Sequence, residues 1–334
     1  MKTVDIAIVG ATGMVGSTVL SLLEERGFPV SHLYLLASEN SVGEDYEFRG
    51  ESFSIEDIAT FDFSKSKLCF FCVGSKIASQ YIPIALSKGN RVIDKSACFR
   101  LDDSVPLVIP EINGSELHQA TQLIAVPNCS VTPIAMALKP IYDAVGITRL
   151  NIATYQSVSG TGKEAVSELA EQTAQLLNGS PIKKKVYPQQ IAFNVLPHIE
   201  DFEENGYTRE EMKIIHELQR IFKDPALKIN PTAVRVPVFY GHSAAVHIET
   251  RDKCSAKNAV QLLKKMPGVE VITGKYPYPT PVKNAAGGDG VYVGRIREDV
   301  SCEKGLNFWV TCDNVRKGAA LNGVQIAEAM LAFL

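Results

Sequence analysis

Cys129 is the residue whose type and position most strongly suggest covalent chemistry. It lies in a polar turn between an apolar run at residues 123–126, which predicts a buried strand, and a helical pattern at residues 131–144. Free backbone N–H groups and the positive end of a helix dipole both favour a thiolate over a thiol. A buried cysteine can equally be a small core residue. The polar residues elsewhere in the chain are needed to distinguish a nucleophilic role of Cys129 from a packing role.

Four other segments combine polar residues with glycine or proline in ways that packing does not require: 97–100, 155–163, 210–213 and 235–242. The last ends at His242, which follows Gly241 at a strand edge, and a cysteine with one histidine suggests a nucleophile with its acid/base partner. His247 falls on the opposite face of the following strand, so the two histidines would not chelate one metal ion. No other His/Cys grouping has ligand spacing, and the sequence predicts no metal site.

A glycine-rich turn near the start suggests a second site. An apolar run at residues 4–9 is followed by GATGMVG at residues 10–16 and by a helical pattern that stops at Gly27. Glycines let the backbone approach a pyrophosphate, and the start of the helix supplies N–H donors. The sequence therefore predicts dinucleotide binding here, by Gly10, Thr12, Gly13, Met14 and Val15.

The elements around these segments indicate an α/β protein. Apolar runs at residues 33–37, 68–73 and 91–94 alternate with helical patterns such as 77–87, which predicts a Rossmann-type doubly wound parallel sheet. After Cys129 the alternation is lost, and a second, α+β domain with a mixed sheet is expected to serve catalysis and dimerisation. Its expected strands are 150–155, 233–238, 244–250, 291–296 and 308–312, and its expected helices are 160–177, 207–222 (exposed) and 256–265.

Chain length and composition limit the function. A chain of 334 residues is too long for one ordinary core, and we expect a dinucleotide-binding domain at residues 1–127 with 314–334 and a substrate-binding, catalytic and dimerisation domain at 128–313. A net charge of −3 argues against nucleic acid or an acidic membrane as partner, and no apolar run reaches the ~18 residues of a membrane span. Seven scattered cysteines and the absence of a signal-peptide pattern favour the cytoplasm. Cys69 and Cys72 form a C-x-x-C inside an apolar strand, which favours core packing.

Taken in order, these segments resemble the bacterial aspartate-β-semialdehyde dehydrogenases over essentially the whole chain. Each piece is moderately specific, but their order and spacing together are very specific. The matching pieces are GATGMVG, Phe99-Arg100, PEIN from Pro110, PNCS around Cys129, YQSVSGTGKEA from Tyr155, QIAFNVLPHI from Gln190, EEMK from Glu210, RVPV and GHS around His242, and DNVRKGAALN from Asp313.

The resemblance implies the NADPH-dependent reduction of 4-phospho-L-aspartate to L-aspartate 4-semialdehyde, with release of phosphate, in lysine (diaminopimelate), threonine and methionine biosynthesis. Cys129 resembles the nucleophile that forms a thioester, His242 the acid/base residue, and Gln156 a residue that positions the substrate. Family roles in substrate binding fall on Arg235 for the α-carboxylate, Glu210 for the ammonium, Arg100 and Lys213 for the phosphate, and Asn128 for the thioester oxygen. Glu210 and Lys213, three residues apart, share a helix face.

For the cofactor, the resemblance implies NADP. The residues expected to bind it, besides those of the glycine turn, are Ser38, Asn40, Ser41, Gly74, Ser159, Gly160 and Asn314. Glu39 stands where many relatives carry an arginine suited to the adenosine 2′-phosphate, and a carboxylate there could instead bind the 2′-hydroxyl of NAD. Lys95 and Cys98 also depart from the family pattern, and Cys98 lies close in sequence to Arg100.

Two other functions fit parts of the sequence. An N-acetyl-glutamyl-phosphate reductase has the same chemistry and a related architecture, but the contexts of Gln156 and of Arg235 to His242 resemble the aspartyl enzyme. A catalytically silent paralogue could act as a regulatory subunit, although Cys129, Gln156, Arg235 and His242 are all present. The expected partners are a small-molecule substrate and a second copy of the chain, in a homodimer or a dimer of dimers.

Overall fold

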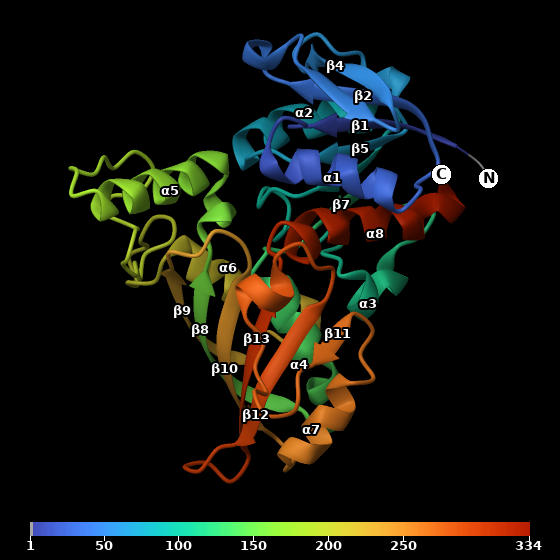
Figure 1. Ribbon diagram of the computed structural model, residues 1–334. Helices are drawn as coiled ribbons and strands as arrows, with labels where there is room; N and C mark the ends of the chain where they lie inside the picture. The colour runs from blue at the N-terminus through green and yellow to red at the C-terminus, as the bar shows by residue number, and fades with distance from the viewer. Residues whose placement is uncertain (1–2) are drawn as a thin grey trace. The chain divides into compact units, whose positions relative to one another are not determined.

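The computed structural model describes residues 3–334. These residues form two compact units (Figure 1). Unit 1 comprises the residues up to Asn128 together with Ala319–Leu334, and unit 2 comprises Cys129–Gly318. Within residues 3–334, no helix combines the length and apolar character needed to cross a membrane.

Unit 1 is built on a seven-stranded sheet of order β3-β4-β2-β1-β5-β6-β7. Every pair is parallel except β3–β4, a hairpin whose turn residues Arg49 and Gly50 have positive φ. This hairpin was not predicted, because its strands are largely polar and exposed. The strands are β1 (Val4–Val9), β2 (Val30–Ala37), β3 (Asp45–Phe48), β4 (Glu51–Asp57), β5 (Leu68–Phe71), β6 (Arg91–Asp94) and β7 (Leu123–Ala125).

Helices cover both faces of this sheet, as expected for a doubly wound fold. Helices α1 (Met14–Glu25) and α8 (Leu321–Met330) pack together on one face, with Leu22, Leu23 and Val324 in the core. Helix α2 (Ser75–Ser87) packs on the other face through Ala78 and Ile82. A one-turn helix, α3 (Pro110–Asn113), lies against α8. The predicted Rossmann-type fold is therefore confirmed.

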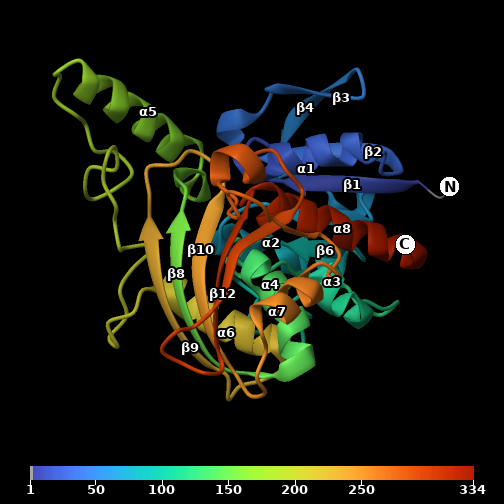
Figure 2. The same ribbon diagram turned by 60° about the horizontal axis from the view of Figure 1, so that its bottom comes forward.

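Unit 2 contains a six-stranded mixed sheet of order β11-β12-β13-β10-β8-β9 (Figure 1). Figure 2 shows the strands β8, β9, β10 and β12 of this sheet from another side. Pairs β8–β9 and β11–β12 are parallel, and the others are antiparallel. The edge strand β9 begins earlier than predicted, because its first residues are polar and it accommodates Pro231, which only an edge strand tolerates. The strands are β8 (Ile147–Gln156), β9 (Lys228–Arg235), β10 (His242–Thr250), β11 (Val269–Val271), β12 (Val291–Glu298) and β13 (Gly305–Cys312).

Three helices, α4 (Val131–Val145), α6 (Arg209–Phe222) and α7 (Ala256–Leu263), pack on one face of this sheet. The prediction of an exposed helix at 207–222 was wrong. Helix α6 buries Ile214, Leu218 and Ile221, which share one stripe at helical spacing. Helix α5 (Lys163–Leu177) instead packs on a separate small apolar cluster, with Leu169, Ile191 and Leu196.

Candidate active site

The carboxyl ends of the parallel strands β8 and β9 bring Gln156 and Arg235 side by side in register. Gln156 Nε2 donates to Glu210 Oε1 at 2.9 Å, and the Ser130 hydroxyl donates to the same oxygen at 3.5 Å. Gln156 and Glu210 are 2% and 4% exposed. A buried carboxylate needs such donors to offset its lost hydration. The pair thus joins strand β8 and the first turn of α6 to the turn that carries Cys129.

Arg235 is a buried cation with part of its donor capacity unused. Its Nη1 donates to the Ser157 carbonyl oxygen at 2.8 Å, whereas its buried Nε has no partner among the described residues. A Cβ added at Gly160 would lie 2.9 Å from Arg235 Nη1 and 3.0 Å from His242 Nε2. The guanidinium and the imidazole therefore converge on the backbone of Gly160.

His242 is the first residue of β10 and is 2% exposed. Its Nδ1 accepts from the Ser157 backbone N–H at 3.1 Å, and its Nε2 is buried without a partner among residues 3–334. Burial, and secondly the charge of Arg235, lower the pKa of His242 well below its usual 6.5. The imidazole is therefore neutral near pH 7, and Nε2 is its one unused nitrogen.

Cys129 lies in the turn directly before α4 and is partly exposed. Gly318, in the helical turn Arg316–Ala320, packs against it so closely that a Cβ there would lie 3.0 Å from the Cys129 carbonyl oxygen. All seven cysteines are free. Burial raises the pKa of Cys69 and of Cys72 to about 12, in agreement with the packing role predicted for that pair.

The remaining substrate-binding candidates lie in different surroundings. Lys213 is bonded to Glu200, so its ammonium is partly neutralised. Arg100 and Asn128 belong to unit 1 and are 6% and 7% exposed. Arg100 Nη2 donates to the Lys95 carbonyl oxygen at 2.8 Å. Cys98 is partly buried, and burial raises its pKa.

The glycine turn of unit 1 has the geometry of a phosphate cradle. Gly10 has a φ of +81°, and a Cβ there would lie 2.6 Å from the Cys72 carbonyl oxygen, so only glycine fits. Helix α1 begins at Met14 after Gly13, which has no side chain to cap the first N–H groups. Gly74 holds the corresponding position before α2. These features suit a dinucleotide pyrophosphate at the start of α1.

The segment after β2 is open. Ser38, Glu39 and Asn40 are exposed and Ser41 is partly exposed, in a short 3-10 turn (Glu39–Ser41). A carboxylate there can turn toward solvent.

Ser159 and Asn314, two of the predicted cofactor residues, lie beside His242. The Ser159 and Ser157 hydroxyls and the Gly241 N–H reach Asn314 Oδ1 at 3.0, 3.1 and 3.0 Å. Sequence reasoning did not identify Ser157, which contacts His242, or Gly318, which packs against Cys129. The only available signal was their position inside the matched segments YQSVSG and DNVRKG.

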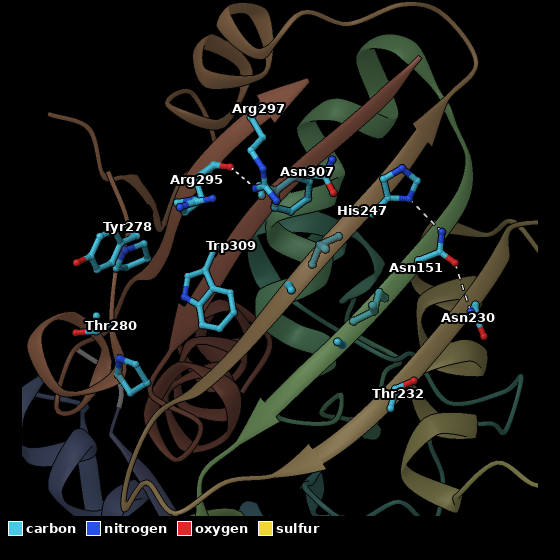
Figure 3. Close-up of a pocket in the computed structure, with 17 residues that line it drawn as sticks. Asn151, Asn230, Thr232, His247, Tyr278, Thr280, Arg295, Arg297, Asn307 and Trp309 are labelled. Carbon is cyan, nitrogen blue, oxygen red and sulfur yellow. Dashed lines mark hydrogen bonds between the residues drawn. The ribbon is translucent and has the colours of Figure 1, made fainter. Parts of the chain in front are cut away.

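The opposite face of the unit 2 sheet, away from α4, α6 and α7, carries a separate cavity of about 690 Å³ (Figure 3). His247 lies there, where Asn151 Nδ2 lies 3.0 Å from its Nδ1. His242 and His247 therefore do lie on opposite faces. Residues 3–334 contain no group of three or more His, Cys, Asp or Glu placed to hold a metal ion.

Comparison with known proteins identifies the family. Residues 5–120 match the semialdehyde dehydrogenase NAD binding domain, and residues 138–317 match the semialdehyde dehydrogenase dimerisation domain. An aspartate-semialdehyde dehydrogenase of Legionella pneumophila is 54% identical over 98% of this chain and 96% of its own length. The chain belongs to the aspartate-semialdehyde dehydrogenase family.

Solved structures of this dehydrogenase family agree in fold. Aspartate semialdehyde dehydrogenase II of Vibrio cholerae, complexed with ASA, superposes with a TM-score of 0.97 at 49% identity, with 99% of each chain covered. A probable aspartate-semialdehyde dehydrogenase of Pseudomonas aeruginosa superposes with a TM-score of 0.93 at 34% identity, also over 99% of each chain. The chain is thus an oxidoreductase of this family, with a nicotinamide-cofactor domain and a dimerisation domain.

Proposed function

We propose that the protein reduces 4-phospho-L-aspartate to L-aspartate 4-semialdehyde with NADPH, through a thioester on Cys129. The observation that carries this is the buried set Gln156, Glu210, Arg235 and His242, held next to the Cys129 turn within one unit. Arg235 and His242 keep buried nitrogens unpaired there. Such atoms are costly unless a ligand uses them. The product would serve lysine, threonine and methionine biosynthesis.

The substrate's charges match the set. The Arg235 guanidinium binds the α-carboxylate, where its planar fork can engage both oxygens. Glu210 binds the α-ammonium, and Gln156, fixed by Glu210, orients the reacting carbonyl. Lys213 binds phosphate after leaving Glu200, to which it is bonded. For Arg100 at the phosphate and Asn128 at the thioester oxygen, support comes from the family pattern alone.

In the biosynthetic direction, the Cys129 thiolate attacks the carbonyl carbon of the acyl phosphate, and phosphate leaves with the electrons of the broken C–O bond. The nicotinamide, when bound, supplies a hydride to that carbon. His242, the acid/base residue, holds the carbonyl oxygen through Nε2 as negative charge develops. Breaking the C–S bond returns its electron pair to the Cys129 sulfur and frees the aldehyde. The covalent intermediate divides one hard step into two easier ones.

NADP is the proposed cofactor, held by the glycine turn (Gly10–Val15) and by the exposed segment after β2. Asn40 and Ser41 can donate hydrogen bonds to a 2′-phosphate, and Glu39 is exposed, so it can turn away at little cost. Discrimination against NAD is expected to be weaker than an arginine at residue 39 would give.

We also propose that the cavity-bearing face of the unit 2 sheet binds a second copy of the chain, in a homodimer or a pair of such dimers. Tyr155 and Tyr278 are 37% and 45% exposed there, and Trp309 lies 5.2 Å from Tyr155 between ring centroids. Arg295 and Arg297 border the same cavity (Figure 3). Tyrosine, tryptophan and arginine are the residues most enriched in protein interfaces. Support also comes from the match of this unit to a dimerisation domain.

The direct test is oxidation of L-aspartate 4-semialdehyde by the purified protein, followed at the absorbance of the reduced cofactor, with NADP and NAD in parallel. Turnover should require inorganic phosphate and should be lost in Cys129→Ser, because a serine hydroxyl is scarcely ionised near neutral pH. The matched control is Cys302→Ser, which changes a partly buried cysteine on a distant loop of the same unit. No phosphate-dependent turnover with either cofactor would refute the proposal.

A further inference from the structure

Ser157 contacts His242 Nδ1 through both its backbone N–H and its hydroxyl. Its backbone N–H lies 3.1 Å from Nδ1 in hydrogen-bonding geometry, and its hydroxyl oxygen lies 3.0 Å from the same nitrogen. A backbone N–H can only donate. Nδ1 must therefore carry a lone pair, because a hydrogen on it would face the hydrogen of the Ser157 amide. The ring hydrogen of the neutral imidazole is left on Nε2.

Asn314 holds the Ser157 side chain in place. The Gly241 N–H donates to the Asn314 side chain at 3.0 Å, which identifies the atom there as the oxygen, not the amide nitrogen. The Ser157 hydroxyl donates to the same oxygen at 3.1 Å, and the Ser159 hydroxyl lies 3.0 Å from both that oxygen and the Ser157 hydroxyl oxygen. Asn314 therefore holds both Ser157, whose amide faces His242 Nδ1, and Gly241, which precedes His242.

We propose that Ser157 and Asn314 are positioning residues that hold His242 as the tautomer with hydrogen on Nε2, aimed at the substrate oxygen. Ser157, Ser159 and Asn314 are 0%, 5% and 3% exposed, so water does not compete for these bonds. Gly241, which donates to Asn314, directly precedes His242, so the same bond also fixes the start of β10. This inference rests on the proposed function for its catalytic consequence, but not for the tautomer itself.

The consequence is that His242 acts first as a hydrogen-bond donor. In the direction of aldehyde formation, the developing negative charge on the substrate oxygen meets an N–H that is already oriented, which is the arrangement that stabilises an oxyanion most. A ring with hydrogen on Nδ1 would present a lone pair to that oxygen and repel it. Positioning of this kind affects kcat more than the Michaelis constant, because the interaction strengthens only as the charge develops.

The test combines nitrogen NMR of 15N-histidine-labelled protein with kinetics. The chain has six histidines, and the His242→Gln variant assigns the His242 signals by their loss. The wild type should show hydrogen on Nε2 and none on Nδ1. In Ser157→Ala the backbone N–H still donates to Nδ1, so the hydrogen should stay on Nε2, whereas kcat should fall by about tenfold to a hundredfold because residue 157 loses its hydroxyl bond to Asn314. The Michaelis constant for the aldehyde should change less than threefold.

Two further variants separate positioning from loss of fold. Ser157→Thr keeps the hydroxyl and should retain most of the activity. The matched control is Ser243→Ala, which removes an equally buried hydroxyl from the other face of β10, where it donates to the Thr311 hydroxyl of β13. This variant should leave both the His242 signals and kcat unchanged. Hydrogen on Nδ1 in the wild type, or an unchanged kcat in Ser157→Ala, would overturn the inference. A wild type without dehydrogenase activity but with hydrogen on Nε2 would refute the proposed function and leave the tautomer assignment intact.

Discussion

Replacing Gly160 by alanine tests how closely the site is packed around its two buried nitrogen groups. Gly160 does not have positive φ, so alanine brings no backbone strain. Its Cβ would lie 2.9 Å from Arg235 Nη1 and 3.0 Å from both His242 Cε1 and His242 Nε2. Ordinary contact between such atoms begins near ~3.5 Å, so the guanidinium and the ring must each move by roughly 0.5 Å.

The size of the effect follows from that displacement. Misplacing a reacting group by ~1 Å costs on the order of a hundredfold in rate, so ~0.5 Å costs about tenfold for each group. Gly160→Ala should therefore lower kcat/KM by roughly ten- to a hundredfold. Overpacking of a buried site costs about 1–3 kcal/mol in the free energy of unfolding. We expect the lower end, because Arg235 Nη1 is the tip of a flexible side chain.

The assay is steady-state oxidation of the aldehyde, with urea denaturation of the same preparation as the stability measurement. Gly114→Ala is the control: Gly114 has helical φ, and the nearest atom to its added Cβ lies 4.0 Å away. It should leave kcat/KM within twofold. If Gly160→Ala keeps the kcat/KM of the wild type, the positions of Arg235 and His242 next to Gly160 do not matter for catalysis, and the reasoning is refuted.

Glu39→Arg should lower the Michaelis constant for NADP and leave that for NAD unchanged or higher; a wild type that already prefers NAD by about tenfold, ~1.4 kcal/mol, would refute the choice of NADP. Folding lowers the pKa of His242, so the unfolded chain binds a proton below its pKa of ~6.5 that the folded protein does not. The free energy of unfolding should therefore decline as the pH falls below ~6.5, by up to ~1.4 kcal/mol per pH unit. Urea denaturation at two pH values should show a smaller decline in His242→Gln. Trp309→Glu should shift the mass measured by light scattering from dimer to monomer, and a dimer of unchanged stability would exclude that face. Thr208→Ala removes the capping box of α6 and should cost about 1 kcal/mol in urea denaturation, with no cost meaning that the cap is not formed.

Much of the fold could be predicted because its apolar residues follow simple periods. The buried strands of unit 1 are continuous apolar runs, and the turn at Gly10 has a positive φ that favours glycine. The hairpin β3–β4 was not predicted because its strands are largely polar and exposed. Helix α6 was assigned the wrong exposure, since its many charged residues conceal a three-residue apolar stripe.

The site was predictable only in part, for a different physical reason. Segment positions singled out Cys129, Gln156, Arg235 and His242 as candidates, but spacing along the chain cannot show which donors meet in space. The bonds from Ser157 and Gly241 to one Asn314 oxygen join residues 73 or more positions apart in sequence. Likewise, the close contact of Gly318 with Cys129 arises from tertiary packing, and no local rule predicts it.

The most direct test of the central claim is to locate the covalent intermediate. The enzyme is mixed with L-aspartate 4-semialdehyde and NADP in the absence of phosphate, quenched in acid within the first turnover, digested, and analysed by mass spectrometry. We predict a mass increase equal to one aspartyl residue on the peptide that contains Cys129, and its loss when phosphate is added before the quench. An adduct on Cys98 or Cys72 instead, or reduced cofactor formed with no adduct on any cysteine, would contradict catalysis through a Cys129 thioester.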